Sequence, residues 1–211
     1  MAIRCERDTR LLFIGDSITD CDRRKDPAEL GFGYVRLIAD HLAAAAPLRA
    51  PLVLNRGVSG NKVPDLERRW HRDALDLRPD VLSVFIGIND VWHGLVPDRE
   101  GCPLPEYVST YRRILAAARA AFPAVELVLC EPSCLRLKEP PDANDLLQPY
   151  VQAVHALAAE FAAVAVVPLY AAFNTAYAQR PDLHWTTDGV HPASTGHMLI
   201  ARNWLSAVGL L

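Results

Sequence analysis

The stretch of sequence that decides the fold is LLFIGDSITD, residues 11–20. Four apolar residues run directly into Gly15-Asp16-Ser17. A continuous apolar run without alternating polar residues is typical of a strand that is buried on both faces of a parallel sheet. We therefore predict such a strand at 11–14, with Ser17 just past its carboxyl end. A serine at that place is either an ordinary cap or turn residue or a nucleophile.

Apolar runs of the same kind alternate with helical segments along the chain. Strand-length runs lie at 11–14, 52–54, 81–86, 125–130 and 164–167, and segments with helical spacing lie at 34–45, 65–77, 105–121, 145–163 and 193–208. This alternation implies right-handed crossovers and helices on both faces of the sheet. The Pro-rich stretch 139–142 is predicted to be a loop within the domain. We therefore predict one α/β domain over 1–211, a three-layer α/β/α sandwich with about five parallel strands.

Length and composition exclude several classes of protein. The 211 residues suit one domain with a sizeable core, since 51% are hydrophobic, 22% are charged and the net charge is only −3. Neither disorder nor a nucleic-acid partner is expected from these values. Five cysteines without a CxxC pair argue against a disulfide framework and a zinc ribbon. We see no signal peptide and no apolar stretch of membrane-span length, so we expect a cytoplasmic protein without a membrane span.

Three further segments stand at predicted strand or loop edges: 55–61, 87–90 and 188–191. Open parallel sheets bind ligands at the carboxyl ends of their strands, where these segments are expected to meet Ser17. A hydroxyl nucleophile needs a base for its proton, and the base needs a group that fixes its tautomer. His191 and Asp188 supply both from one loop. We therefore predict a catalytic Ser17, His191 and Asp188.

The negative oxygen that forms on an attacked carbonyl needs hydrogen-bond donors aimed at it. The backbone N–H groups of Ser17 and Gly57 and the side-chain amide of Asn89 are predicted to be these donors. The polar side chains beside these donors are predicted to support the loops: Asp16, Asp90 and Asn61. Ser59 is an alternative nucleophile, but its place between Val58 and Gly60 favours a tight loop.

Taken together, these segments resemble the SGNH hydrolases, a branch of the GDSL esterase and lipase family. The matching residues are Gly15-Asp16-Ser17, Gly57 in NRGVSG, Gly87-Ile88-Asn89-Asp90 and Asp188-Gly189-Val190-His191. The resemblance extends from residue 11 to about residue 202. It implies a flavodoxin-like fold and ester hydrolysis without a metal or cofactor. It also implies the roles proposed above for Ser17, Gly57, Asn89, Asp188 and His191.

Other kinds of site fit the sequence less well. The α/β-hydrolase elbow Gly-x-Ser-x-Gly does not occur, and neither do the dinucleotide and P-loop glycine motifs. A zinc site from His184, His191, His197 and Asp188 is an alternative. It is disfavoured because His197 falls inside a predicted helix beyond Pro192.

The chain also resembles small bacterial esterases that act on short acyl chains, because it has no insertion long enough to form a lid. We therefore expect a small-molecule ester substrate, with a carbohydrate O-acetyl ester as the first hypothesis. Lysophospholipids and acyl thioesters are the enzymatic alternative. A catalytically inactive carbohydrate-binding domain is the alternative from a different class. Nothing in the sequence predicts an oligomeric state.

Overall fold

The centre of the molecule is a parallel five-stranded sheet in the order β2-β1-β3-β4-β5, seen in a computed structural model that describes residues 2–138 and 141–211. The strands are β1 (Arg10–Gly15), β2 (Leu52–Gly57), β3 (Val81–Phe85), β4 (Glu126–Cys130) and β5 (Ala165–Val167). All neighbouring strands run parallel. This strand order is that of flavodoxin-like folds, with the direction of winding reversed between β1 and β3. The predicted α/β sandwich with about five strands is confirmed.

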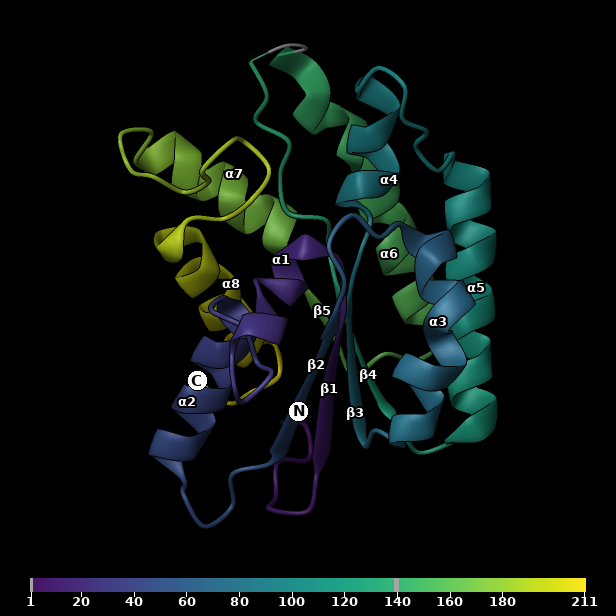
Figure 1. Ribbon diagram of the computed structural model, residues 1–211, viewed down its shortest axis with the longest axis vertical. Helices are drawn as coiled ribbons and strands as arrows, with labels where there is room; N and C mark the ends of the chain where they lie inside the picture. The colour runs from purple at the N-terminus through teal and green to yellow at the C-terminus, as the bar shows by residue number, and fades with distance from the viewer. Residues whose placement is uncertain (1, 139–140) are drawn as a thin grey trace.

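Helices cover both faces of the sheet. They are α1 (Ser17–Asp20), α2 (Tyr34–Ala45), α3 (Val63–Asp73), α4 (Ile88–Trp92), α5 (Leu104–Ala121), α6 (Gln148–Glu160), α7 (Leu169–Gln179) and α8 (Ser194–Ala207). Helices α2, α7 and α8 lie on one side, and α3, α5 and α6 lie on the other (Figure 1). Short 3-10 helices lie at Arg23–Lys25, Leu75–Leu77, His93–Leu95 and Pro141–Leu147.

The packing of β1 explains why residues 11–14 are all apolar. Leu11 and Phe13 pack into the core under α2 and α8, whereas Leu12 and Ile14 pack into the core under α3 and α5. All four side chains are at most 1% exposed. Successive side chains of a strand point to opposite faces, so a strand with helices on both sides has no solvent face.

The structure adds helices that the sequence pattern did not predict, namely α1, α4 and α7. Helices α1 and α4 are too short for a 3.6-residue period to be visible. Helix α7 begins directly after β5 and Pro168, without an intervening loop. The helix predicted at 65–77 ends at Asp73 and is followed by the 3-10 helix Leu75–Leu77. Of the loop predicted at 139–142, residues 139 and 140 lie outside the described residues, and Pro141 already begins a 3-10 helix.

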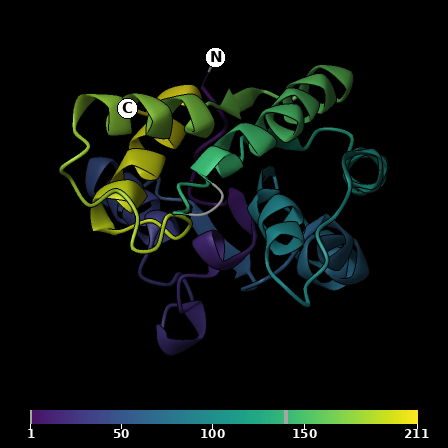
Figure 2. The same ribbon diagram turned by 90° about the horizontal axis from the view of Figure 1, so that it is seen from above.

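The register of the sheet brings the ends of three strands together. Gly15, the last residue of β1, is aligned with Gly57 of β2 and with Phe85 of β3. Seen from above, α1 lies between the loop that precedes α8 and the helix α4 (Figure 2). The segments after β1, β2 and β3 therefore meet at one edge of the sheet.

Candidate active site

Ser17 is held at the end of β1 by a tight turn. It is the first residue of α1, and the Asp16 side chain accepts a hydrogen bond from the Ile18 N–H at 3.0 Å. Gly15 is required for this turn, because a Cβ there would lie 2.2 Å from the Phe85 carbonyl oxygen. Ser17 therefore comes two residues after a position at which β1 packs too closely against β3 for any residue larger than glycine.

The predicted base and its partner lie beside Ser17. The Ser17 Oγ is 3.0 Å from His191 Nε2, and His191 Nδ1 is 2.7 Å from Asp188 Oδ2. An ionised carboxylate only accepts, so the pairing places the imidazole proton on Nδ1 and leaves Nε2 as an acceptor for the serine hydroxyl. The geometry is that of a nucleophile, a general base and an orienting acid.

The loop that carries Asp188 and His191 is held by its own atoms. The Asp188 Oδ1 accepts hydrogen bonds from the N–H groups of Val190 and His191, at 3.0 and 2.8 Å. Partial burial alone would raise the pKa of this carboxyl, but the hydrogen bonds from the His191 ring and from the two backbone N–H groups outweigh it, so the pKa lies below its usual range. Asp188 is therefore ionised at neutral pH, as an orienting carboxylate must be.

Two contacts from other elements fix the His191 loop in place. The Arg136 N–H, after β4, donates to the Gly189 carbonyl oxygen at 2.8 Å. The Trp92 ring of α4 meets the His191 ring edge to face, with centroids 5.8 Å apart. Trp92 was not singled out from the sequence, and its place directly after Asn89-Asp90-Val91 is the signal that could have identified it.

Two of the predicted oxyanion donors are available in the structure. Within the described residues no acceptor takes the backbone N–H of Ser17. Asn89 is 1% exposed, and its Nδ2 donates to the Asn61 carbonyl oxygen at 3.0 Å. An amide nitrogen carries two hydrogens, so this bond orients Asn89 and leaves the second hydrogen for a ligand.

The structure corrects the assignment of Gly57. The Gly57 N–H donates to the Asn55 Oδ1 at 2.8 Å, so it is already used inside the fold. A Cβ at Gly57 would lie 2.1 Å from the Asp20 nitrogen, which shows that this glycine lets α1 pack against β2. Sequence spacing alone did not separate the two glycines of the NRGVSG segment.

Gly60 is the residue with a free donor in that segment. It is the third residue of a turn closed by the Asn61 N–H on the Val58 carbonyl oxygen at 3.2 Å, and its φ of +80° is one that glycine adopts without strain. No acceptor among the described residues takes the Gly60 N–H. The hydroxyl of the neighbouring Ser59, the alternative nucleophile, donates to Asp20 Oδ2 at 2.9 Å. This hydrogen bond connects the turn to α1 and engages the Ser59 hydroxyl.

Comparison with known proteins agrees with this arrangement. The model of the GDSL-like lipase/acylhydrolase family matches residues 13–199. The chain belongs to this family. The predicted SGNH-type serine ester hydrolase is thereby confirmed.

Individual relatives of this hydrolase cover almost its whole length. An acetylxylan esterase from Geobacillus stearothermophilus is 35% identical over 95% of this chain and 94% of the relative. A solved GDSL-like lipase from Parabacteroides merdae has a TM-score of 0.91, with 36% identity and full coverage of both chains. The structure of the Geobacillus acetylxylan esterase, Axe2, has a TM-score of 0.87, with 33% identity over 98% of this chain and 97% of that one. Catalytic mutants of Axe2 that replace a serine, an aspartate or a histidine by alanine also have solved structures.

The three predicted supporting residues of the hydrolase lie behind the donors. Asp16 and Asp90 are 1% and 2% exposed, and each has one oxygen without a hydrogen-bond partner within the described residues. Burial raises the pKa of both carboxyls to about 7. The hydrogen bond from Ile18 to Asp16 and the one from Val63 to Asp90 lower these pKa values by less than burial raises them. The charge of Asp90 further raises the pKa of Asp16. Asn61 accepts from Asn89 through its carbonyl and from Arg69 Nε through Oδ1, at 2.7 Å.

The alternative zinc ligands are not gathered in the described part of the hydrolase. No three His, Cys, Asp or Glu side chains there lie close enough together to hold a metal ion. His197, on α8, accepts a hydrogen bond from the Tyr34 N–H at its Nδ1, 3.2 Å away, and its Nε2 lies 3.5 Å from Cys21 Sγ. His197 therefore joins α8 to α2.

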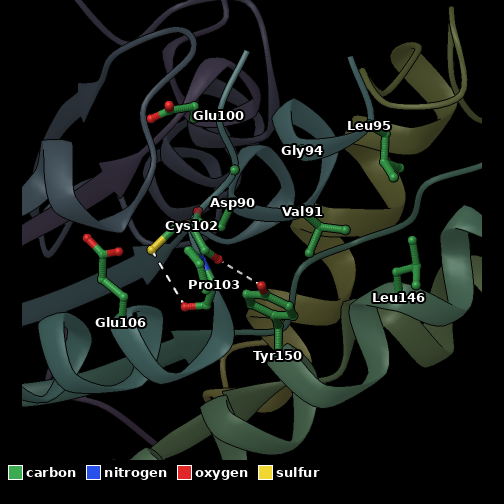
Figure 3. A pocket seen from close by; sticks show the side chains of 11 residues that line it. Asp90, Val91, Gly94, Leu95, Glu100, Cys102, Pro103, Glu106, Leu146 and Tyr150 are labelled. Carbon is green, nitrogen blue, oxygen red and sulfur yellow. Dashed lines mark hydrogen bonds between the residues drawn. The ribbon is translucent and has the colours of Figure 1, made fainter. Parts of the chain in front are cut away.

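The hydrolase has a small hollow at Ser17 and a larger one nearby. The first has a volume of about 260 Å³ and is lined by Ser17, Ser59, His191 and their neighbours. The second has a volume of about 670 Å³ and lies between α4, α5 and α6, where the Tyr150 hydroxyl donates to the Cys102 carbonyl oxygen at 2.7 Å (Figure 3). No residue of the predicted catalytic trio lines the second hollow. None of the helices in the described residues is both long and apolar enough to cross a membrane.

Proposed function

We propose that this hydrolase removes short acyl groups, acetyl above all, from O-acylated carbohydrates through an acyl-Ser17 intermediate. The observation that carries the proposal is the chain of contacts from Ser17 Oγ through His191 to Asp188, at 3.0 and 2.7 Å. The catalytic Axe2 mutants, which replace the same three residue types, support it.

The reaction follows from this geometry. Ser17 Oγ attacks the ester carbonyl carbon while its proton moves to His191 Nε2, and the resulting imidazolium is stabilised by Asp188. The tetrahedral intermediate collapses, the C–O bond to the sugar breaks, and His191 returns the proton to the leaving alkoxide. Water then attacks the acyl-Ser17 ester by the same route, releasing the carboxylic acid and the free serine.

The negative oxygen of each tetrahedral intermediate needs donors. We assign them to the Ser17 N–H, the Gly60 N–H and the second Asn89 amide hydrogen, because these have no acceptor among the described residues or have one hydrogen to spare. Gly60 takes the place of Gly57 in this assignment, because the Gly57 N–H is bound to Asn55.

Two observations favour a short acyl group on a carbohydrate. The hollow at Ser17 is only about 260 Å³, which suits an acetyl group better than a long acyl chain. The Geobacillus relative named above is an acetylxylan esterase. Lysophospholipids and acyl thioesters remain the less favoured substrates.

The decisive test is replacement of the nucleophile. Ser17→Ala should lose at least about 10⁴-fold in kcat towards 4-nitrophenyl acetate, since the serine, base and acid act as a unit. The same variant should lose labelling by a fluorophosphonate probe while its circular dichroism spectrum stays unchanged. If a Ser17→Ala preparation free of host esterases kept the turnover of the native protein, Ser17 would be ruled out as the nucleophile. Absence of labelling in the native protein would favour the carbohydrate-binding alternative.

The substrate is tested separately. We expect kcat/KM to fall steeply beyond four carbons in a 4-nitrophenyl ester series and acetate to be released from acetylated xylo-oligosaccharides. A maximum at eight carbons or more would contradict the short-acyl assignment.

The remaining properties follow from composition and site chemistry. We propose a single catalytic domain over 1–211 that works without a metal, so activity should survive dialysis against EDTA. The five free cysteines favour a reducing compartment such as the cytoplasm. With a net charge of −3, nucleic acid is not a proposed partner.

A further inference from the structure

Arg69 of α3 contacts two of the three segments that carry the oxyanion donors, and it reaches the third, that of Asn89, through Asn61. Its side chain is 9% exposed. Its Nη2 donates to the Gly15 carbonyl oxygen at 3.0 Å, its Nη1 to the Arg56 carbonyl oxygen at 2.7 Å, and its Nε to Asn61 Oδ1 at 2.7 Å. One guanidinium therefore binds the ends of β1 and β2 and the turn that follows β2.

Each of these acceptors leads directly to a proposed donor. Gly15 precedes Ser17 by two residues. Arg56 is four residues before Gly60, and Asn61 follows Gly60 directly. The Asn61 carbonyl oxygen in turn accepts from Asn89 Nδ2 at 3.0 Å. A movement of the guanidinium would therefore be transmitted to all three donors.

The geometry points to Arg69 as a positioning residue for the oxyanion hole: its planar fork sets the spacing of the Ser17 N–H, the Gly60 N–H and the Asn89 amide without touching the ester. This inference rests on the proposed function. A guanidinium presents its donors in a rigid plane, whereas a lysine ammonium is a single point on a flexible stem and cannot span the same acceptors. Carbonyl oxygens that lose a buried partner are free to shift towards other donors.

The charge of Arg69 is neutralised outside the site. Its Nη1 lies 3.0 Å from Asp73 Oδ2, and Asp73 is also bound by Arg72 at 2.7 Å. Arg72 is 76% exposed, and its hydrogen bonds within the described residues go only to Asp73. Arg72 therefore shares the ion pair with Arg69 but has no link to the donors, which makes it a matched control.

The test compares Arg69→Lys with Arg72→Lys. We expect Arg69→Lys to lose about 10²-fold in kcat with KM changed less than about threefold, because misplaced donors weaken the transition state more than the ground state. Affinity for phenylboronic acid, which forms a tetrahedral adduct with an active serine, should fall alongside kcat. Arg72→Lys should keep kcat, KM and boronate affinity within about threefold of the native values. If Arg69 had only a structural role, Arg69→Lys would lower the melting temperature and leave kcat, KM and boronate affinity unchanged.

Three outcomes overturn the inference. The first is a folded Arg69→Lys protein with the kcat of Arg72→Lys. The second is a loss of kcat in Arg69→Lys without loss of boronate affinity. The third concerns Asn61→Ala, which replaces Arg69→Lys as the test variant if Arg69→Lys does not fold. Asn61→Ala removes one acceptor of Arg69 in a partly exposed turn. An unchanged kcat in Asn61→Ala refutes the positioning role of Arg69, whereas a loss of about tenfold at constant KM supports it. Failure of the proposed function itself is distinguished by Ser17→Ala, which would then retain activity.

Discussion

The two sides of the active site are held in different ways. On the nucleophile side, Asp16, Asn89 and Asp90 are at most 2% exposed. Arg69 binds the ends of β1 and β2 and Asn61, whose carbonyl oxygen in turn accepts from Asn89. On the base side, the side chains of His191 and Asp188 are 36% and 48% exposed and are held mainly within their own loop. The nucleophile side is thus part of the core, whereas the base side is a local, surface-level structure.

This difference determines how each side should respond to change. We expect a substitution in the base loop to lower activity and to leave the core intact. We expect a substitution on the nucleophile side to lower both activity and stability, because the same buried groups would serve both.

The base side should show a large catalytic effect with little change in stability. In serine proteases, Asn in place of the orienting Asp lowers kcat by about 10⁴, because the imidazole adopts the wrong tautomer. We expect Asp188→Asn to lose between about 10³ and 10⁴ in kcat, measured with 4-nitrophenyl acetate. The melting temperature should change by less than about 3 °C, since Asn keeps the Oδ1 acceptor for Val190 and His191. A loss under tenfold would show that Asp188 does not orient His191.

The nucleophile side should show a smaller catalytic effect together with a loss of stability. Asn89→Ala removes one donor to the negative oxygen and should reduce kcat by about 10²-fold, or about 3 kcal/mol. It also leaves the half-buried Asn61 carbonyl oxygen without its hydrogen bond from Asn89, so the free energy of unfolding should fall by about 1 kcal/mol. Steady-state kinetics and urea unfolding measure the two effects. A kcat within threefold of native would exclude Asn89 from the oxyanion hole.

The buried carboxyls of the nucleophile side should make it less stable as the pH rises. Burial raises the pKa of Asp90 from 3.8 to about 7, so the folded protein binds this proton more tightly than the unfolded chain does. The contribution of Asp90 to the free energy of unfolding is therefore full below about pH 4, falls as the pH rises to about 7, and then levels off.

Asp90→Asn should remove part of that fall. Asn keeps an acceptor for the Val63 N–H and carries no charge next to Asp16, so the variant should gain on the order of 2 kcal/mol at pH 8 relative to its value at pH 4. Urea unfolding across this range measures the effect. Glu106→Gln is the control, because Glu106 and Asp90 both line the larger hollow. It should leave the pH dependence of stability unchanged. Parallel profiles for native and Asp90→Asn would contradict the assignment.

Beside the base loop, His197 should produce the opposite pH dependence. Burial, with a smaller contribution from the charge of His191, lowers the pKa of His197 from 6.5 to about 4. Its contribution to stability is present above about pH 6.5 and is lost as the pH falls to about 4. His197→Asn keeps an acceptor for the Tyr34 N–H, so it should reduce the acid-side loss by about 1 kcal/mol. Melting temperatures at pH 4–7 test this, with His71→Asn on the exposed surface as control; equal slopes would contradict it.

The same contrast explains what the sequence predicted and what it did not. The fold followed from strands such as 11–14 that are apolar at every position, and the base loop followed from the three-residue step between Asp188 and His191. Both signals are local. The choice between Gly57 and Gly60 depends on which N–H is taken by Asn55, and the role of Arg69 depends on contacts between α3, β1 and β2. Such contacts are set by packing between distant segments, which spacing along one sequence does not reveal.

The separation of Ser17 and His191 along the chain has a consequence for folding. The Ser17 Oγ and the His191 ring are in contact although 174 positions separate them. Helices and strands can form without that contact, whereas the proposed ester cleavage needs both segments in place on the folded sheet. Turnover regained during refolding from urea should therefore time the completion of the tertiary structure.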